Sequence, residues 1–260
     1  MSTSDPAPRT VSFGARDVPE AEKESLVRGV FDQVAPAYDV MNDLMSAGVH
    51  RAWKQVLLDR LSPQPGQVLL DVAGGTGDVA AGFLGRADGR PARGRPQARA
   101  VICDINHSMM AAGRERRDAA ALGDRLARVC GDAERLPFPD GSFDAYTIAF
   151  GIRNVTHRDR ALAEARRVLR RGGRFFCLEF SRPVTAGFGA LYDAYSDAVI
   201  PRLGKAVAGD AESYRYLVES IRRFPPQSAF AAEVEAAGFS RVSVENLTGG
   251  IAALHGGWKL

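Results

Sequence analysis

The sequence contains few cysteines, and the three that it has form neither a metal-binding nor a disulfide pattern. Cys103, Cys130 and Cys177 are far apart, their number is odd, and no C-x-x-C spacing occurs. Structural zinc sites and the disulfide frameworks of small secreted proteins need closely spaced or even-numbered cysteines. We therefore predict no metal site, and we expect three buried, reduced thiols.

The sequence also lacks an apolar run long enough to cross a bilayer, and its N-terminus lacks the apolar core of a secretory signal. The net charge is only +3 over 260 residues. This mild excess does not indicate a protein that binds nucleic acid, although it would help association with anionic lipid surfaces. We expect a cytoplasmic protein that makes transient contact with the inner face of a membrane.

The chain is predicted to form one domain after a polar tail. Residues 1–21 are rich in Pro, Ser and charged side chains, which predicts a disordered tail. Apolar residues at helical spacing then predict an N-terminal helical cap over residues 22–61, within a domain that spans 22–260. A second group of helices is expected over residues 183–224, as an insertion on the substrate side of the domain.

Between these helical parts the pattern alternates between short apolar runs and amphipathic segments, which is typical of a parallel sheet covered by helices on both faces. The fold class is therefore α/β and Rossmann-like. The expected strands are 68–72, 100–104, 126–130, 143–150 and 173–180, with helices at 107–121 and 158–170. A helix from Pro225 to about Gly238 and two strands, 239–247 and 250–258, are expected to complete the domain.

A glycine-rich loop follows the first of these strands and opens a helix. Gly75, Gly77 and Ala80 satisfy the G-x-G-x-x-G/A pattern of dinucleotide-binding loops. Asp71, however, ends the strand beside the loop, where a carboxylate would repel a pyrophosphate. Such an acid suits a cationic ligand, and we predict that Asp71 holds the amino-acid end of S-adenosylmethionine. Asp78 either assists or serves only as a helix first-turn acid.

Acidic residues also end the next two strands. A carboxylate at Asp104 can accept both hydroxyl groups of a ribose, although it could equally cap the following helix. Asp132 and the backbone at Ala133 follow the third strand, where they can read an adenine edge. Because the carboxyl ends of parallel strands meet at one edge of the sheet, the sequence predicts a nucleoside site there.

The sequence resembles the ubiquinone/menaquinone biosynthesis C-methyltransferases, a family of class I S-adenosylmethionine-dependent methyltransferases. The resemblance covers residues 22–260 and is most specific in the N-terminal run from Tyr38-Asp39 through Met41-Asn42, Met45-Ser46 and His50 to Trp53. Similar runs are Asp71 to Asp78, Asp104 to Asn106, Gly131 to Asp144, Phe150 to Val155, Arg167 to Gly173 and Asn246 to Lys259.

The resemblance implies a seven-stranded sheet with an antiparallel last strand and a prenylated benzoquinol or naphthoquinol substrate. It also implies S-adenosylmethionine contacts at Thr76, Asp104, Asp132 and Ala133. We count Ala149 among the cofactor-binding residues, although it stands where a serine is common before the Phe-Gly pair.

Methylation of a ring carbon needs an ionised phenol, and ionising one at pH 7 costs about 4 kcal/mol because a phenol titrates near 10. Arg153 follows the fourth strand, and we predict that it stabilises the phenolate while Asn154 orients a hydroxyl or a water. The alternative for Arg153 is a structural ion pair with Asp132 or Asp144. Asp39 and His50 are candidate general bases. The alternative is the capping of a turn for Asp39, and helix capping or packing for His50.

Two other functions compete with this one. An NAD-dependent oxidoreductase would also use the glycine loop and Asp104. A catalytically silent subunit of a quinone-synthesis complex would keep the fold without the reaction. The sequence does not give the oligomeric state, and a homodimer or a quinone-biosynthesis complex would both be compatible with it.

Overall fold

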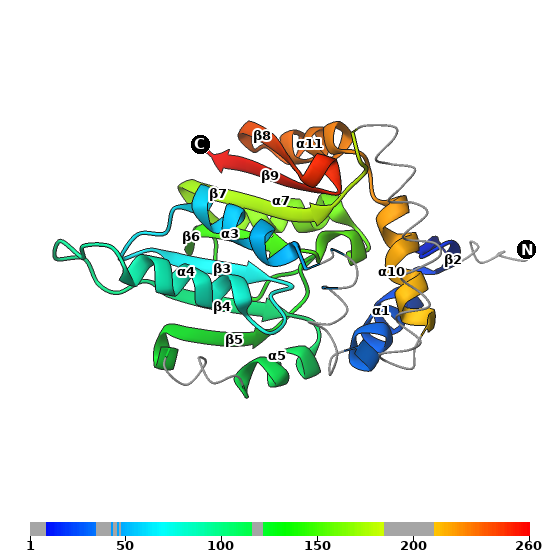
Figure 1. Ribbon diagram of the computed structural model, residues 1–260, viewed down its shortest axis with the longest axis horizontal. Helices are drawn as coiled ribbons and strands as arrows, with labels where there is room; N and C mark the ends of the chain where they lie inside the picture. Colours follow the sequence, from blue (N-terminus) through cyan, green and yellow to red (C-terminus); the bar gives the residue numbers. More distant parts are fainter. Residues whose placement is uncertain (1–8, 35–42, 44–45, 47, 116–121, 185–210) are drawn as a thin grey trace, which may run out of the picture.

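The computed structural model describes residues 9–34, 43, 46, 48–115, 122–184 and 211–260 (Figure 1). Its main sheet consists of β3 (Val68–Val72), β4 (Arg99–Asp104), β5 (Leu126–Cys130), β6 (Phe143–Ala149), β7 (Leu169–Phe180), β8 (Ser240–Leu247) and β9 (Ala252–Lys259). The helices are α1 (Glu20–Val34), α3 (His50–Leu61), α4 (Asp78–Asp88), α5 (His107–Arg114), α7 (Arg158–Val168), α10 (Ala211–Arg223) and α11 (Gln227–Ala236). Short 3-10 helices are η2 (Gly123–Arg125), η3 (Ile152–Asn154) and η4 (Thr248–Gly250).

The seven strands lie in the order β5-β4-β3-β6-β7-β9-β8. Strands β5, β4, β3, β6 and β7 are parallel, whereas β9 is antiparallel to both β7 and β8. The strand order reverses between β3 and β6, because β4 and β5 lie on one side of β3 and β6 lies on the other. The loops that follow β3 and β6 therefore lead away from each other and leave a crevice between the two strand ends. The predicted α/β sheet with an antiparallel last strand is confirmed.

Helices cover both faces of the sheet, and each layer has its own core. One core joins side chains of α3 and α4, such as Leu57 and Phe83, to the sheet residue Ile102. The other joins side chains of α7 and α11, such as Leu162 and Phe230, to the opposite face. Helices α1 and α10 instead lie together beyond the carboxyl ends of the parallel strands (Figure 1). That edge is where an open α/β sheet binds its ligands.

The predicted disordered tail is wrong for residues 10–21. Residues 10–19 form a β-hairpin of β1 (Thr10–Phe13) and β2 (Arg16–Pro19), and α1 begins at Glu20. Gly14 takes a left-handed φ of 56° at the turn. Phe13 and Val18 are buried, and the ring of Phe13 stacks on Tyr216 of α10 at 4.4 Å between centroids. The hairpin is thus stabilised by a helix about 200 residues away, which the local composition could not reveal.

Most other boundaries agree with the predictions to within a few residues, and the strand at 68–72 agrees at both ends. One thiol differs from expectation, since Cys103 and Cys177 are buried but Cys130 is exposed. Of the helical insertion predicted over 183–224, residues 185–210 lie outside the described part of the chain. The part from 211 onward is α10 and the turn after it.

Candidate functional site

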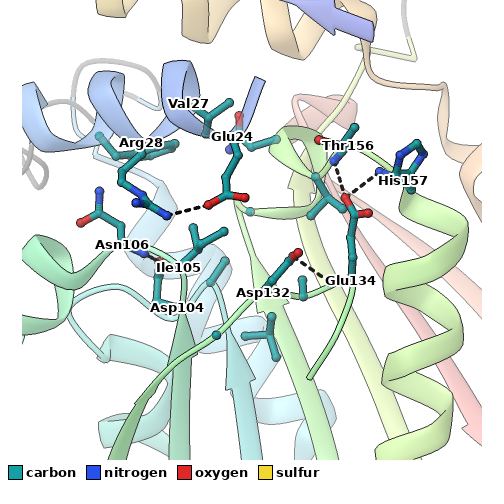
Figure 2. A pocket seen from close by; sticks show the side chains of 18 of the residues that line it. Glu24, Val27, Arg28, Asp104, Ile105, Asn106, Asp132, Glu134, Thr156 and His157 are labelled. Carbon is teal, nitrogen blue, oxygen red and sulfur yellow. Dashed lines mark hydrogen bonds and ion pairs between the residues drawn. The ribbon is translucent and has the colours of Figure 1, made fainter. Parts of the chain in front are cut away.

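A cavity of about 540 Å³ opens at the carboxyl ends of β3, β4, β5 and β6, and we refer to it as the large cavity. Its size is typical of sites for small-molecule ligands and cofactors. The loops after these strands form its floor, and helix α1 lies across it with Glu24, Val27 and Arg28 pointing inward (Figure 2). Glu24 and Arg28 form an ion pair at 2.6 Å in this roof.

Asp104 ends β4 and lies in the large cavity with only 8% of its surface exposed. Its Oδ2 accepts the backbone N–H of Gly75 at 2.8 Å, and its Oδ1 accepts that of Asn106 at 2.8 Å. Asn106 caps α5, because its side chain accepts the N–H of Met109 at 2.9 Å. Asp104 is therefore not needed as a cap. Each carboxylate oxygen keeps a lone pair that can accept a ligand hydroxyl.

Burial raises the pKa of Asp104, while the N–H groups of Asn106 and Gly75 oppose that shift. A carboxylate held in this way is oriented before a ligand arrives. The geometry fits the predicted contact with two neighbouring hydroxyl groups.

Asp132, Ala133 and Glu134 follow β5 and also line the large cavity. Asp132 Oδ1 accepts the backbone N–H of Glu134 at 2.9 Å, which closes a tight turn. Glu134 Oε1 accepts the backbone N–H groups of Thr156 and His157 at 3.0 and 2.8 Å (Figure 2). Glu134 thus joins the loop after β5 to the start of α7. Asp132 and the main chain at Ala133 are left facing the cavity.

Two glycines of the loop after β3 adopt the left-handed backbone conformation that glycine favours. Gly75 has a φ of 51° and Gly77 a φ of 93°, both in the left-handed region. A Cβ on Gly77 would lie 2.6 Å from Ile102 Cδ1, so the loop packs directly on β4. Gly75 reaches the large cavity, whereas Gly77 begins α4 behind it.

Asp71 lies on a second, much smaller cavity of about 20 Å³, whose lining includes Thr76, Ala149 and the ion pair of Lys54 and Asp78. The carboxyl group is 1% exposed; its Oδ1 accepts the hydroxyl of Thr147 at 2.7 Å, and its Oδ2 is buried without a hydrogen bond from any described residue. Burial raises the pKa of Asp71 to about 7. A cationic donor beside this oxygen would compensate for the buried negative charge and supply the missing hydrogen bond.

Asp78, at the first turn of α4, forms an ion pair with Lys54 at 2.8 Å. The carboxylate of Asp78 is thus held by a side chain of α3. This contact favours its structural interpretation over a direct role in holding a ligand.

Arg153 does not line the large cavity, contrary to its predicted role beside the substrate. Its Nη1 lies 2.7 Å from Glu179 Oε1 and donates at 2.6 Å to the carbonyl of Phe150, and Nε donates to Ser220 at 3.4 Å. The side chains of Arg153 and Glu179 are 3% and 1% exposed. The predicted alternative, an ion pair, is right in kind but wrong in partner, since neither Asp132 nor Asp144 takes part.

Asn154 faces the large cavity, as predicted for a residue that orients a hydroxyl. Its Oδ1 accepts the phenolic hydroxyl of Tyr216 at 3.0 Å. This bond orients the amide so that its NH₂ group remains available as a donor. The sequence did not assign this contact to Tyr216, because only the fold brings α10 to the loop after β6.

The two candidate bases have different outcomes. Asp39 lies outside the described residues. His50 is buried at the start of α3, where its Nδ1 lies 3.1 Å from Ser46 Oγ and 3.5 Å from Asp43 Oδ1. Ser46 Oγ also accepts the backbone N–H of His50 at 3.1 Å. These contacts favour the capping and packing interpretation of His50 over catalysis.

Two further partners were missed by sequence reasoning. Thr147 on β6 satisfies Asp71, and Glu179 on β7 satisfies Arg153. The signal for Glu179 was an acid inside the apolar run Phe175 to Phe180, because a buried charge needs a partner. Within the described part of the chain, no cluster of His, Cys, Asp or Glu has the makeup of a metal site.

The model of the ubiE/COQ5 methyltransferase family matches residues 17–259 of this chain. A protein of Paracoccus denitrificans, named ubiquinone/menaquinone biosynthesis C-methyltransferase UbiE, is 57% identical over 97% of this chain and 98% of its own. A protein of the same name from Caulobacter vibrioides is 56% identical over 96% and 98%. These relatives give no support to the oxidoreductase alternative or to a silent subunit.

Two solved structures with the same fold are distant in sequence. A putative methyltransferase from Haloferax volcanii, solved with the Trm112 activator, superposes with a TM-score of 0.61 at 17% identity, over 90% of this chain and 97% of its own. A Thermotoga maritima methyltransferase, described as a possible histamine N-methyltransferase, has a TM-score of 0.61 at 18% identity, over 89% and 99%. These likenesses establish the fold alone.

Proposed function

Because the chain belongs to the ubiE/COQ5 methyltransferase family, we propose that it transfers a methyl group from S-adenosylmethionine to a ring carbon of a prenylated quinol in ubiquinone or menaquinone biosynthesis. The observation that carries this proposal is the identity of more than half of the residues with relatives of that name, over nearly the full length of both chains. The large cavity at the strand ends supplies a site of suitable size.

The described residues fit the cofactor. S-adenosylmethionine supplies, when bound, an electrophilic methyl group on a sulfonium. Asp104 would accept the ribose hydroxyls with the lone pairs left by Gly75 and Asn106. Asp132 and the main chain at Ala133 would contact the adenine at the end of β5.

The glycine loop would hold the amino-acid end of the cofactor. Asp71 Oδ2 is a buried acceptor without a bond from a described residue, so an ammonium group nearby would stabilise its charged form. Gly75 and Gly77 place the loop backbone against β4, and Thr76 and Ala149 line the small cavity beside Asp71. This arrangement suits a cation better than a pyrophosphate.

The reacting ring would lie in the large cavity beside Asn154. The amide NH₂ of Asn154, oriented by Tyr216, can donate to a quinol oxygen as negative charge develops there. Arg153 would act at one remove, because its contacts with Phe150 and Glu179 fix the loop that carries Asn154. The quinol form is required, since the ring of a quinone is too electron-poor to attack a methyl group.

A prenyl tail brings the substrate from a membrane, so we propose transient contact between the protein and an anionic lipid surface. Among the helices that the structure describes, none has the length and apolar character that a bilayer-spanning segment needs. Flotation with vesicles that contain phosphatidylglycerol should carry part of the protein upward, and vesicles of phosphatidylcholine should carry less. The absence of any flotation would refute the contact.

Calorimetry and quinone analysis test the function together. S-adenosylmethionine should bind the purified chain, NAD(H) should not, and Asp104→Ala should weaken cofactor binding about 10-fold or more, since hydrogen bonds to a charged group contribute about 1.5–3 kcal/mol. Asp88→Ala, which removes an exposed partner of Arg125, is the control and should bind normally.

A strain without this protein should accumulate a quinone that lacks one ring methyl group, and normal quinones in that strain would contradict the proposal.

A further inference from the structure

A separate polar cavity of about 160 Å³ lies beside the large cavity, between the N-terminal hairpin, α1, α7 and α10, and we refer to it as the polar cavity. Thr156 lines both cavities, so the two are neighbours. The proposed methyl transfer makes no direct use of the polar cavity.

Four cationic side chains line the polar cavity, and no carboxylate belongs to its described lining. They are Lys23 of α1, Arg153 of η3, Arg158 of α7 and Arg223 of α10. Ser12 and Tyr216 also line the cavity. Such a lining is suited to a ligand that is negatively charged and that accepts several hydrogen bonds.

Three of the four cations have carboxylate partners outside the cavity lining. Arg153 pairs with Glu179 at 2.7 Å, Arg158 with Glu233 at 2.8 Å, and Arg223 with Asp17 at 2.8 Å. A guanidinium has five N–H donors, so an arginine with one carboxylate partner retains donors for a second ligand. These ion pairs hold the three arginines in place. The fourth cation has no such carboxylate partner among the described residues.

Lys23 is that fourth cation. It is 5% exposed, and its Nζ donates to the carbonyl of Val155 at 3.2 Å. No carboxylate of a described residue lies within ion-pair distance of Nζ; Glu134 attracts it from farther away, but its Oε1 already accepts two backbone N–H groups. Buried ammonium groups are normally paired, because an unpaired charge in the interior is strongly destabilising.

Burial and the nearby charge of Arg158 both lower the pKa of Lys23. An anion in the polar cavity would offset both effects. We propose that the polar cavity binds an oxyanion of the phosphate class, with Lys23 as its central contact and Arg153, Arg158 and Arg223 around it. The anion can be free phosphate or the phosphate of an anionic lipid headgroup, and the two sources share the same chemistry.

Equilibrium dialysis of the full chain with radiolabelled inorganic phosphate tests the proposal. Saturating S-adenosylhomocysteine and constant ionic strength should be used, because Arg9, Arg28 and Arg160 line the large cavity and could also attract phosphate. We expect one phosphate per chain and at least 10-fold weaker binding by Lys23→Met, which keeps the length of the side chain and removes its charge. Arg171→Met, at an exposed position near the start of β7, is the matched control and should bind normally.

A second measurement does not depend on the folding of a variant. The chain has four lysines, and reductive methylation followed by peptide mass spectrometry reports the reactivity of each. Phosphate should protect Lys23 and leave Lys54 as the internal reference. Vesicles that contain phosphatidic acid, compared with vesicles of phosphatidylcholine alone, form the lipid arm.

The outcomes separate the two sources and test the site. Protection by free phosphate identifies a soluble anion as the ligand, and protection only by phosphatidic acid vesicles identifies the headgroup. Protection by neither, or phosphate binding that Lys23→Met leaves unchanged, would overturn the proposal. Neither result would bear on the binding of S-adenosylmethionine, which calorimetry measures independently.

Discussion

Asp71 and Asp104 both lie near the carboxyl ends of adjacent strands, but their surroundings differ. Both oxygens of Asp104 accept a backbone N–H, whereas Oδ2 of Asp71 accepts none from a described residue. Asp104 is therefore already oriented to accept hydrogen bonds. The ionised form of Asp71 is destabilised by burial, and a bound cation would stabilise it. The sequence predicted both positions, but not this difference, because it depends on neighbours from other strands.

The raised pKa of Asp71 predicts a pH-dependent stability. The folded-state pKa of about 7 lies above the ordinary value of 3.8, so the folded chain holds the proton more tightly than the unfolded chain. The stabilisation by the protonated form is complete below pH 4 and is lost as the pH rises toward 7. Relative to the wild type, Asp71→Asn should therefore gain up to about 4 kcal/mol in unfolding free energy between pH 4 and 7. Urea unfolding at several pH values measures this, and parallel pH profiles for the two proteins would contradict it.

The ion pair of Arg153 and Glu179 predicts a large effect of a small substitution. Glu179→Gln should lower the unfolding free energy by about 3 kcal/mol, because it leaves a buried guanidinium without a countercharge. Urea unfolding gives this value. Glu245→Gln, in the exposed pair with Arg60, is the control and should change stability little. An equal loss of unfolding free energy in the two variants would show that the buried pair stabilises the fold no more than the exposed pair does.

At the scale of elements, the strands were the most predictable part of the chain. Runs such as 68–72 are buried on both faces, so their apolar residues are continuous and easily recognised. The hairpin β1–β2 was missed because Phe13 and Val18 pack on α1 and α10 rather than on sequence neighbours. An element whose burial depends on distant partners has no local signal of comparable strength.

Helix α4 offers a matched pair of glycine substitutions. Gly77→Ala should destabilise the fold by about 1–3 kcal/mol, because Gly77 has a φ of 93° and a Cβ there would lie 2.6 Å from Ile102 Cδ1. Gly85→Ala, inside the same helix, has no atom near the new Cβ and should stabilise by about 0.5–1 kcal/mol. Thermal and urea unfolding should thus give opposite signs. The same sign for both would mean that the loop is not packed on β4 as described.

At the scale of the whole molecule, the sheet order brings residues far apart in the chain to one edge. The loops after β3, β4, β5 and β6 meet there, and α1 and α10 close the edge from outside (Figure 1). The acids of these loops were predictable because parallel strands end at the same edge. The contacts made by α1 and α10 were not, since nothing local indicates which helix will cover the site.

Tyr216 is the clearest link between the covering helices and the site. Tyr216→Phe should lower kcat by about 3- to 10-fold, since it removes one hydrogen bond that orients Asn154. The affinity for S-adenosylmethionine should be unchanged, which separates a positioning role from general damage to the site. Tyr146→Phe, which removes a buried hydroxyl without a partner among the described residues, is the control and should keep full activity. A fall in cofactor affinity by Tyr216→Phe would contradict this role.

Methyl transfer itself is the most direct test of the account. The purified chain should be incubated with S-adenosylmethionine labelled at the methyl group and a prenylated quinol that lacks one ring methyl, and the product should be examined by mass spectrometry. We predict a label on a ring carbon when the substrate is reduced, and none when it is kept as the quinone. A label on oxygen, or no transfer to the reduced substrate by protein that binds the cofactor, would contradict the account.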